Sequence, residues 1–278
     1  MAIPVFAPNP DPDCMFLTPV LKQAKKKING MIQAKEGLAC IFGDNGFGKS
    51  SLLRSIAGTY DSDERFKVAF LANKNNDISP MAFLRLIGLE LDIPPQRSRM
   101  AQMVAMEEYL DEQNQTGKTV MVLIDEAQRL PAETMEVVRS LLNYETNTSK
   151  LCQIIMAGEL TFRDRLMTKR YKAFKSRIVA PVVLELFTAQ ETTDMIAFRH
   201  ERWGVDNKFT DAACGEIYTL TRGVPRDCVV LAGYAYKIAG EESLASIGPG
   251  VIQRAYEMML TSSARESVEA AELAAAGT

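Results

Sequence analysis

The chain contains a glycine-rich run whose residue types bind phosphate groups, Gly43-Asp-Asn-Gly-Phe-Gly-Lys-Ser50. Glycines let the backbone wrap closely enough for its N–H groups to point at phosphate oxygens. Lys49 can reach the β- and γ-phosphates of a nucleotide, and the hydroxyl of Ser50 can be a ligand of Mg²⁺. The run matches the P-loop pattern in full. We therefore expect the following residues to bind ATP: Gly43, Asp44, Asn45, Gly46, Phe47, Gly48, Lys49, Ser50 and Ser51.

A second motif consists of two acids that follow the apolar run 120–124. A buried strand that ends in two acids places both carboxylates at the carboxyl edge of a parallel sheet, where ligands bind in open α/β folds. There Asp125 would hold Mg²⁺ through water, and Glu126 would polarise the water that attacks the γ-phosphate. Two solvated acids at a strand end are common by themselves. Because a complete P-loop precedes them in the chain, we predict that these acids are catalytic and act together with Lys49.

Two arginines are further candidates for catalysis. Arg226 follows Gly223-Val-Pro at the start of a helix, and Arg177 precedes the last strand. Arg226 could sense the γ-phosphate within its own subunit, while Arg177 could reach the site of a neighbouring subunit. The alternative for both is a surface arginine or a structural ion pair, which weighs as much as the functional role for Arg177 and less for Arg226. Three other arginines compete with Arg177 for its role: Arg163, Arg165 and Arg170.

The elements that must position these residues alternate between short apolar strands and helices. We expect strands at 38–42, 67–72, 120–124, 151–156 and 179–186. We also expect a helix from Ser50 to Ala57 that Gly58 closes. This alternation predicts a parallel sheet that is covered by helices on both faces.

The strand signal stops after Phe187. Thr188 and Glu191 form a capping box that opens a helix running toward Trp203, and helical patterns follow it at 210–221, 225–239 and 249–260. The predicted fold class is therefore α/β, with a P-loop core and a small C-terminal helical lid domain. The expected parts are an N-terminal arm and helix at 1–36, the core at 37–186, the lid at 187–260, and a disordered tail at 261–278.

The composition narrows the class of protein. The formal net charge is −3, so bulk charge does not attract nucleic acid, and any DNA contact must come from local basic clusters. The cysteines (Cys14, Cys40, Cys152, Cys214 and Cys228) show no metal-ligand spacing, which favours reduced thiols in a reducing compartment. The chain has no apolar run of the roughly 20 residues that span a bilayer. We expect a cytoplasmic protein without a membrane partner.

With these motifs placed, the chain resembles the AAA+ ATPases of the ExeA type, whose relatives include the transposon ATPases TnsC, TniB and MuB. The resemblance extends roughly from Phe6 to Ala239. It rests on the P-loop together with Asn9-Pro-Asp-Pro12, Phe16-Leu-Thr-Pro19, Ile124-Asp-Glu-Ala-Gln128, Met156-Ala-Gly-Glu-Leu160, Ser176-Arg-Ile178 and Gly223-Val-Pro-Arg226.

The resemblance implies roles for particular residues. Asp125 and Glu126 would be the Walker B acids, Arg226 the sensor-2 arginine, and Arg177 the arginine finger. One position departs from the family pattern, because Glu159 stands where the sensor-1 residue is typically polar and neutral. This departure implies slow hydrolysis, suited to a switch.

The resemblance also implies partners. Membrane-anchored members carry a transmembrane helix and a wall-binding module, and neither is present in this sequence. The shorter members act in DNA transposition: they form ATP-dependent rings or filaments on duplex DNA and recruit the transposase. We therefore expect a homo-oligomer that binds double-stranded DNA and a transposase, or another recombination or replication protein.

Contacts to DNA phosphates would come from Lys74, Arg97 and Arg99, in loops after the second strand and before the following long helix. These residues could equally be solvated loop charges. His200, the single histidine, is expected on a helix surface. Two other functions remain open: a helicase loader or replication initiator, and an ATP-stabilised scaffold in which hydrolysis is not the output.

Overall fold

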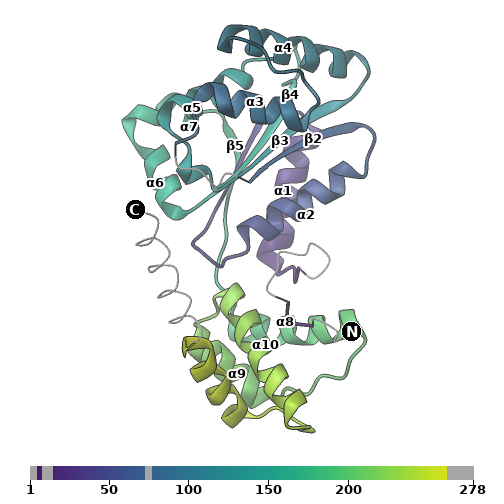
Figure 1. The fold of residues 1–278 in the computed structure, drawn as a ribbon, viewed down its shortest axis with the longest axis vertical. Coiled ribbons are helices and arrows are strands. Elements are labelled where there is room, and N and C mark those ends of the chain that lie inside the picture. The colour runs from purple at the N-terminus through teal and green to yellow at the C-terminus, as the bar shows by residue number, and fades with distance from the viewer. Residues whose placement is uncertain (1–4, 8–14, 73–76, 262–278) are drawn as a thin grey trace. The chain divides into compact units, whose positions relative to one another are not determined.

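We analysed a computed structural model of the 278-residue chain, which describes residues 5–7, 15–72 and 77–261. The chain forms two compact units (Figure 1). The α/β unit is Pro10–Glu185, and the helical unit combines Met1–Asn9 with Leu186–Thr278. The first helix thus belongs with the sheet and residues 5–7 with the helical unit, whereas the sequence analysis grouped both in one N-terminal part.

The α/β unit is built on a five-stranded sheet in the order β2-β3-β4-β1-β5. All of its strand pairs are parallel, and its strands are β1 (Leu38–Phe42), β2 (Phe66–Ala72), β3 (Thr119–Asp125), β4 (Cys152–Gly158) and β5 (Ile178–Val183). The predicted parallel α/β fold is confirmed. Because the strands are parallel, the residues that follow β1, β3 and β4 all lie at one edge of the sheet.

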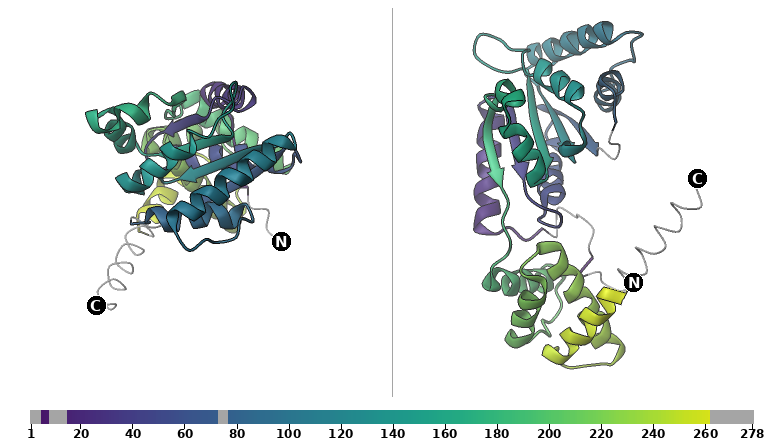
Figure 2. Two further views of the ribbon diagram at one scale, coloured as in Figure 1. Left: turned by 90° about the horizontal axis from the view of Figure 1, so that it is seen from above. Right: turned by 90° about the vertical axis from the view of Figure 1, so that its left-hand side faces the viewer.

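Helices cover both faces of the sheet (Figures 1 and 2). Successive residues of a strand point to opposite faces, so Ala39 and Ile41 pack with α1 (Pro19–Gln33) and α2 (Lys49–Asp61). Leu38, Cys40 and Phe42 face the second layer. That layer contains α3 (Pro80–Glu90), α4 (Arg99–Gln115), α5 (Ala132–Leu141), α6 (Leu160–Met167) and α7 (Lys172–Lys175). The sheet is therefore buried on both sides, as its near-continuous apolar strands require.

Several element boundaries differ from those expected. Gly58 does not close the second helix, because α2 continues to Asp61. Tyr60 in the last turn packs edge-on against Phe66 at 4.6 Å between ring centroids, and its hydroxyl pairs with Asn29 at 3.2 Å. This packing outweighs the cost of about 1 kcal/mol for glycine inside a helix. β5 ends at Val183 rather than at residue 186, and α6 and α7 were not expected.

The helical unit contains α8 (Ala189–Trp203), α9 (Asp211–Thr221), α10 (Pro225–Glu241) and a helical segment at 249–261. The predicted capping box is confirmed: the Thr188 hydroxyl accepts from the Glu191 amide at 3.1 Å, and the Glu191 carboxylate accepts from the Thr188 amide at 2.8 Å. The tail expected from residue 261 lies, apart from that residue, outside the described part of the chain.

The expectation of a surface histidine is wrong. His200 is 2% exposed, and its ring packs against Phe6, Phe209 and Tyr236. Phe6 comes from the N-terminal segment. The residue pattern of α8 alone does not indicate that this segment packs on His200. None of the helices in the described part of the chain combines the length and apolar character needed to cross a bilayer.

Candidate nucleotide site

The glycine-rich loop connects the carboxyl end of β1 to the start of α2. Gly48 caps α2 in the left-handed region, with φ 89° and ψ 15°, a conformation that favours glycine. The first amides of a helix have no acceptor within it, and the helix dipole adds positive potential there. The loop and the start of α2 together therefore have features that suit the binding of an anion, and the binding of nucleotide phosphates here stays a prediction.

Lys49 lies at the centre of this turn and is 5% exposed. Its ammonium group donates to the carbonyl oxygen of Asp44 at 3.0 Å. Burial lowers the pKa of Lys49, and the carboxylates of Glu126, Glu159 and Asp125 counteract that shift through their negative charge. The lysine of the glycine loop and the acids that follow β3 and β4 therefore face one another at the same edge of the sheet.

The acid pair begins where β3 ends. Asp125 is 6% exposed, and its carboxylate accepts a hydrogen bond of 2.9 Å from the amide of Glu126. Glu126 itself has φ 54° and ψ 41°, in the left-handed region. That conformation costs a non-glycine residue about 1 to 2 kcal/mol, and strained backbone of this kind clusters at functional sites. The sharp turn ends the strand and aims the two acids differently, with Asp125 buried and Glu126 partly exposed.

A magnesium ion would suit the oxygens at this edge. A hydroxyl at Ser50 and a carboxylate at Asp125 are hard oxygen donors, the ligands that Mg²⁺ prefers. The described residues contain no cluster of three His, Cys, Asp or Glu that could hold a metal by itself. Such a cluster is not needed, because Mg²⁺ at nucleotide sites is bound by one or two protein groups together with substrate phosphates and water.

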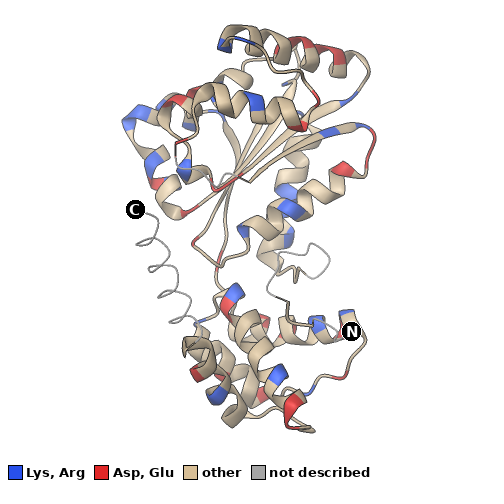
Figure 3. Ribbon diagram, in the orientation of Figure 1, with Lys and Arg blue, Asp and Glu red and all other residues tan. Residues whose placement is uncertain are grey.

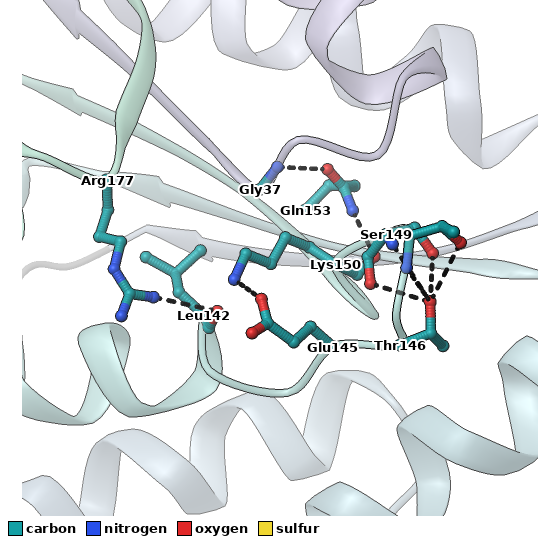
Figure 4. Close-up of polar contacts among 9 residues, drawn as sticks. Gly37, Leu142, Glu145, Thr146, Ser149, Lys150, Gln153 and Arg177 are labelled. Carbon is teal, nitrogen blue, oxygen red and sulfur yellow. Dashed lines mark hydrogen bonds and ion pairs between the residues drawn. The ribbon is translucent and has the colours of Figure 1, made fainter.

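Arg177 lies beside Leu142 (Figure 4), at the opposite edge of the sheet from the glycine loop. Its neighbour Ile178 pairs with Leu38 at the start of β1, while the loop follows Phe42 at the end of that strand. Five strand residues separate the two edges by roughly 15 Å. Arg177 donates to the carbonyl oxygen of Leu142 at 3.4 Å. It therefore does not reach the glycine loop of its own chain.

Arg226 belongs to the helical unit, where it is exposed in the first turn of α10. The turn before it depends on Gly223, which has φ 74°. A Cβ atom at this position would lie 2.1 Å from the carbonyl oxygen of Phe187. Glycine at 223 is therefore needed locally to join α9 to α10, and the role of Arg226 toward the nucleotide stays a prediction.

The expected DNA contacts lie elsewhere on the α/β unit. Lys74 falls outside the described residues. Arg97 and Arg99 are exposed, on either side of Ser98, which caps the start of α4. Basic and acidic residues are interspersed along the helices (Figure 3). The contacts of Arg97 and Arg99 with DNA stay a prediction.

Residues that sequence reasoning assigned no role surround Glu126. The side-chain amide of Gln128 donates to the Glu126 carboxylate at 2.9 Å, and Arg129 lies 3.5 Å from the same oxygen. Arg165, considered only as a competitor for the finger role, donates to the carbonyl oxygens of Gln128 and Ala127. The only sequence signal for Gln128 was its place in Asp125-Glu-Ala-Gln128. This motif does not indicate where the side-chain amide of Gln128 points.

Comparisons with known proteins agree with this geometry. A family model described as AAA domain matches residues 32–166. General secretion pathway protein A of Aeromonas hydrophila is 25% identical over 256 residues, which cover 87% of this chain and 46% of that protein. The chain thus spans less than half the length of this curated relative. The similarity supports the resemblance to the ExeA type of ATPase, whereas the likeness to the transposon ATPases stays a prediction.

Solved structures share the fold at low sequence identity. Cdc6p from Pyrobaculum aerophilum superposes with a TM-score of 0.68 at 15% identity, covering 91% of this chain and 70% of that one. A Walker-type ATPase of Pyrococcus abyssi gives 0.65 at 16% identity, with 95% and 79% covered. The Holliday junction branch migration motor RuvB of Thermotoga maritima gives 0.57 at 17%, with 85% and 68% covered. Residues 32–166 therefore match the AAA domain, and the chain shares the fold of these ATPases.

Proposed function

We propose that residues 43–51 bind the phosphates of ATP and that Glu126 polarises the water that hydrolyses it. The observation that carries this assignment is the position of Lys49, buried in the glycine loop with the carboxylates of Asp125 and Glu126 close enough to raise its pKa against the effect of burial. A cation in the phosphate-binding turn, facing an acid at the end of β3, is the arrangement that phosphoryl transfer to water needs.

In this reaction the oxygen of water bonds to the γ-phosphorus, and the bond from that phosphorus to the β–γ bridging oxygen breaks. The products are ADP, inorganic phosphate and a proton. Lys49 stabilises negative charge on the β- and γ-phosphates, and Glu126 orients the water and draws on its proton. Ser50 and Asp125 would hold a Mg²⁺ ion, which supplies charge neutralisation to the phosphates when it is bound.

The two arginines keep their predicted roles in this proposal. Arg177 acts on a neighbouring subunit, which its place at the far edge of the sheet supports, since it does not reach the loop of its own chain. Arg226 senses the γ-phosphate. Both roles require the chain to work as an oligomer or to change shape with its nucleotide, as expected of an ATP-dependent switch.

For the biological output, we infer a DNA-binding regulator that assembles on duplex DNA with ATP, selects target DNA and recruits a transposase. Exposed Arg97 and Arg99 support this role, because they provide a local positive site on a chain whose net charge is −3. Lys74 is the third basic residue proposed to contact DNA phosphates. The described cysteines, Cys40, Cys152, Cys214 and Cys228, are buried and free, which fits a reducing compartment such as the cytoplasm.

Imaging of the protein with duplex DNA and a non-hydrolysable ATP analogue tests this inference. We expect rings or filaments that require both ligands. Replacing Arg97 and Arg99 together with serine should weaken DNA binding about equally for every sequence and lower its salt dependence. DNA-independent assembly, or no assembly at all, would contradict the proposed role.

A role in secretion is the second candidate, and the 25% identity to General secretion pathway protein A favours it. Purification of the tagged protein from its own cells separates the two. Recovery of a transposase with DNA supports target selection. Recovery of secretion components supports a role in secretion, and recovery of a replicative helicase supports a role in replication.

A further inference from the structure

The side chain of Gln128 connects the acid after β3 to the end of β4. Its Nε2 donates to the carboxylate of Glu126 at 2.9 Å, and its Oε1 accepts from the backbone N–H of Glu159 at 3.3 Å. Glu159 directly follows β4, which lies between β3 and β1 in the sheet. One amide therefore joins the acid pair to the strand beside the glycine loop.

The backbone that carries this amide is held from a third place. Arg165 on α6 donates to the carbonyl oxygen of Gln128 at 3.1 Å and to that of Ala127 at 3.4 Å. The guanidinium of Arg165 lies over the rings of Phe162 and Tyr171, at 5.2 Å and 5.6 Å from their centroids. These contacts restrict the turn that begins at the strained Glu126, so the amide of Gln128 has a defined position.

The amide of Gln128 has the donor and the acceptor that the two bonds need. A hydrogen-bond donor is needed toward the Glu126 carboxylate, and an acceptor is needed toward the Glu159 N–H. The side chain of Glu159 is a carboxylate and, when ionised, offers no donor to Glu126. Alanine at 128 would supply neither group, and glutamate would supply only the acceptor. Neither replacement would keep both bonds.

Arg129 also lies near Glu126, but its interaction is weaker. Its Nε is 3.5 Å from the carboxylate oxygen, and the side chain is 40% exposed. Exposed ion pairs contribute little energy and hold their partners loosely. The shorter bond from Gln128 is the better-defined contact.

We propose that Gln128 is a positioning residue for hydrolysis: its amide holds the carboxylate of Glu126 in place for the attacking water and ties that carboxylate to the end of β4. The proposal rests on the hydrolytic role proposed for Glu126. Gln128 acts through Glu126, so it affects turnover and leaves the phosphate-binding turn unchanged.

The first test compares turnover with nucleotide affinity. We expect Gln128→Ala to lower kcat by roughly 10- to 100-fold, the effect of losing one hydrogen bond to a charged group. The Kd of a non-hydrolysable ATP analogue should change by less than about 2-fold, since Lys49 and the loop are untouched. Gln190→Ala is the matched control, because Gln190 makes a similar bond of 2.8 Å to Asp194 at an exposed position of α8. It should leave kcat unchanged.

A second variant separates positioning from folding. Gln128→Glu keeps the acceptor toward Glu159 and places a second carboxylate beside Glu126. We expect kcat to fall as in Gln128→Ala, because the new carboxylate has no hydrogen to donate to Glu126 and repels its negative charge. In the nucleotide-free protein, the amide of Glu159 should exchange with solvent faster in Gln128→Ala and at the wild-type rate in Gln128→Glu.

A double-variant cycle identifies the path of the effect. If Gln128 works through Glu126, adding Gln128→Ala to Glu126→Gln should slow turnover by less than about 2-fold beyond Glu126→Gln alone. An independent further loss overturns the proposal. So does wild-type kcat in both Gln128 variants, or a similar loss in Arg129→Ala with none in Gln128→Ala. If Glu126→Gln itself retains wild-type turnover, the proposed role of Glu126 fails first, and the inference about Gln128 falls with it.

Discussion

The guanidinium of Arg199 donates a hydrogen bond of 3.0 Å to the carbonyl oxygen of Val5, which lies 194 positions earlier in the sequence. A second bond, of 3.3 Å, reaches the carbonyl oxygen of Ala7. Between them, Phe6 is 7% exposed within the helical unit. The chain therefore joins the helical unit to the α/β unit at two places, once after residue 9 and once before residue 186.

The N-terminal segment should stabilise the helical unit. Phe6→Ala removes a buried ring that packs against His200, Phe209 and Tyr236. We expect a loss of about 3 kcal/mol in the free energy of unfolding, as for other buried aromatic truncations. Denaturant titration followed by circular dichroism measures it. Met258→Ala, at a side chain 42% exposed in the same unit, should change stability by less than about 0.5 kcal/mol.

The stability of the helical unit should fall as the pH is lowered. Burial lowers the pKa of His200 below its usual 6.5. Between the lowered pKa of the folded state and the usual pKa of the unfolded state, the unfolded chain binds more protons than the folded chain. The contribution of His200 to the free energy of unfolding is therefore fully present above pH 6.5 and decreases as the pH falls toward the folded pKa. Denaturant titrations at pH 7.5 and 5.5 measure this change. His200→Phe replaces the imidazole with a ring that does not titrate, so stability should depend less on pH in this variant. An unchanged dependence would assign the effect to other residues.

The turn between α9 and α10 should tolerate only glycine at 223. Gly223→Ala places a Cβ atom 2.1 Å from the carbonyl oxygen of Phe187 and strains the backbone at φ 74°. We expect the free energy of unfolding to fall by at least about 2 kcal/mol, because the backbone is strained and the chain must also move to make room for the Cβ atom. Gly215→Ala is the control, since its Cβ would meet nothing within 4 Å inside α9. There alanine should stabilise by up to about 1 kcal/mol.

Lys49 should be needed for nucleotide binding. Lys49→Ala removes the buried cation of the glycine loop, and we expect at least a 10-fold rise in the Kd for ATP, from the loss of a charged hydrogen bond to phosphate. Isothermal titration calorimetry with Mg²⁺ present measures the Kd. Lys67→Ala, which removes an exposed lysine on β2, should bind ATP like the wild type. Equal affinity in both variants would contradict the assigned phosphate site.

Arg177 should act between subunits. Arg177→Ala and Glu126→Gln chains are each expected to hydrolyse ATP slowly. In mixed oligomers, a site with an intact Glu126 can receive Arg177 from its neighbour, so mixing should restore part of the activity. A mixture no more active than its components would show that Arg177 has another role, such as its bond to Leu142.

The proposed nucleotide site could be located from the sequence because its determinants are local. A glycine-rich turn between an apolar strand and a helix depends on neighbouring residues, and the same is true of the acids at 125 and 126. One general rule then suffices to bring these motifs together: parallel strands present their carboxyl ends at one edge. The capping box at Thr188 and Glu191 was predictable for the same reason, since its partners are three residues apart.

Tertiary structure decided the contacts that join distant segments. Gly58 was expected to end a helix, but packing of Tyr60 on Phe66 extends that helix to Asp61. His200 was expected in solvent, but Phe6 covers it from the start of the chain. The periodicity of a segment shows which of its faces is apolar. It does not indicate which distant side chain packs against that face. The sequence alone therefore determined the P-loop motif and the acids expected to face it, while the direction of the Gln128 amide depended on where β4 and α6 place Glu159 and Arg165.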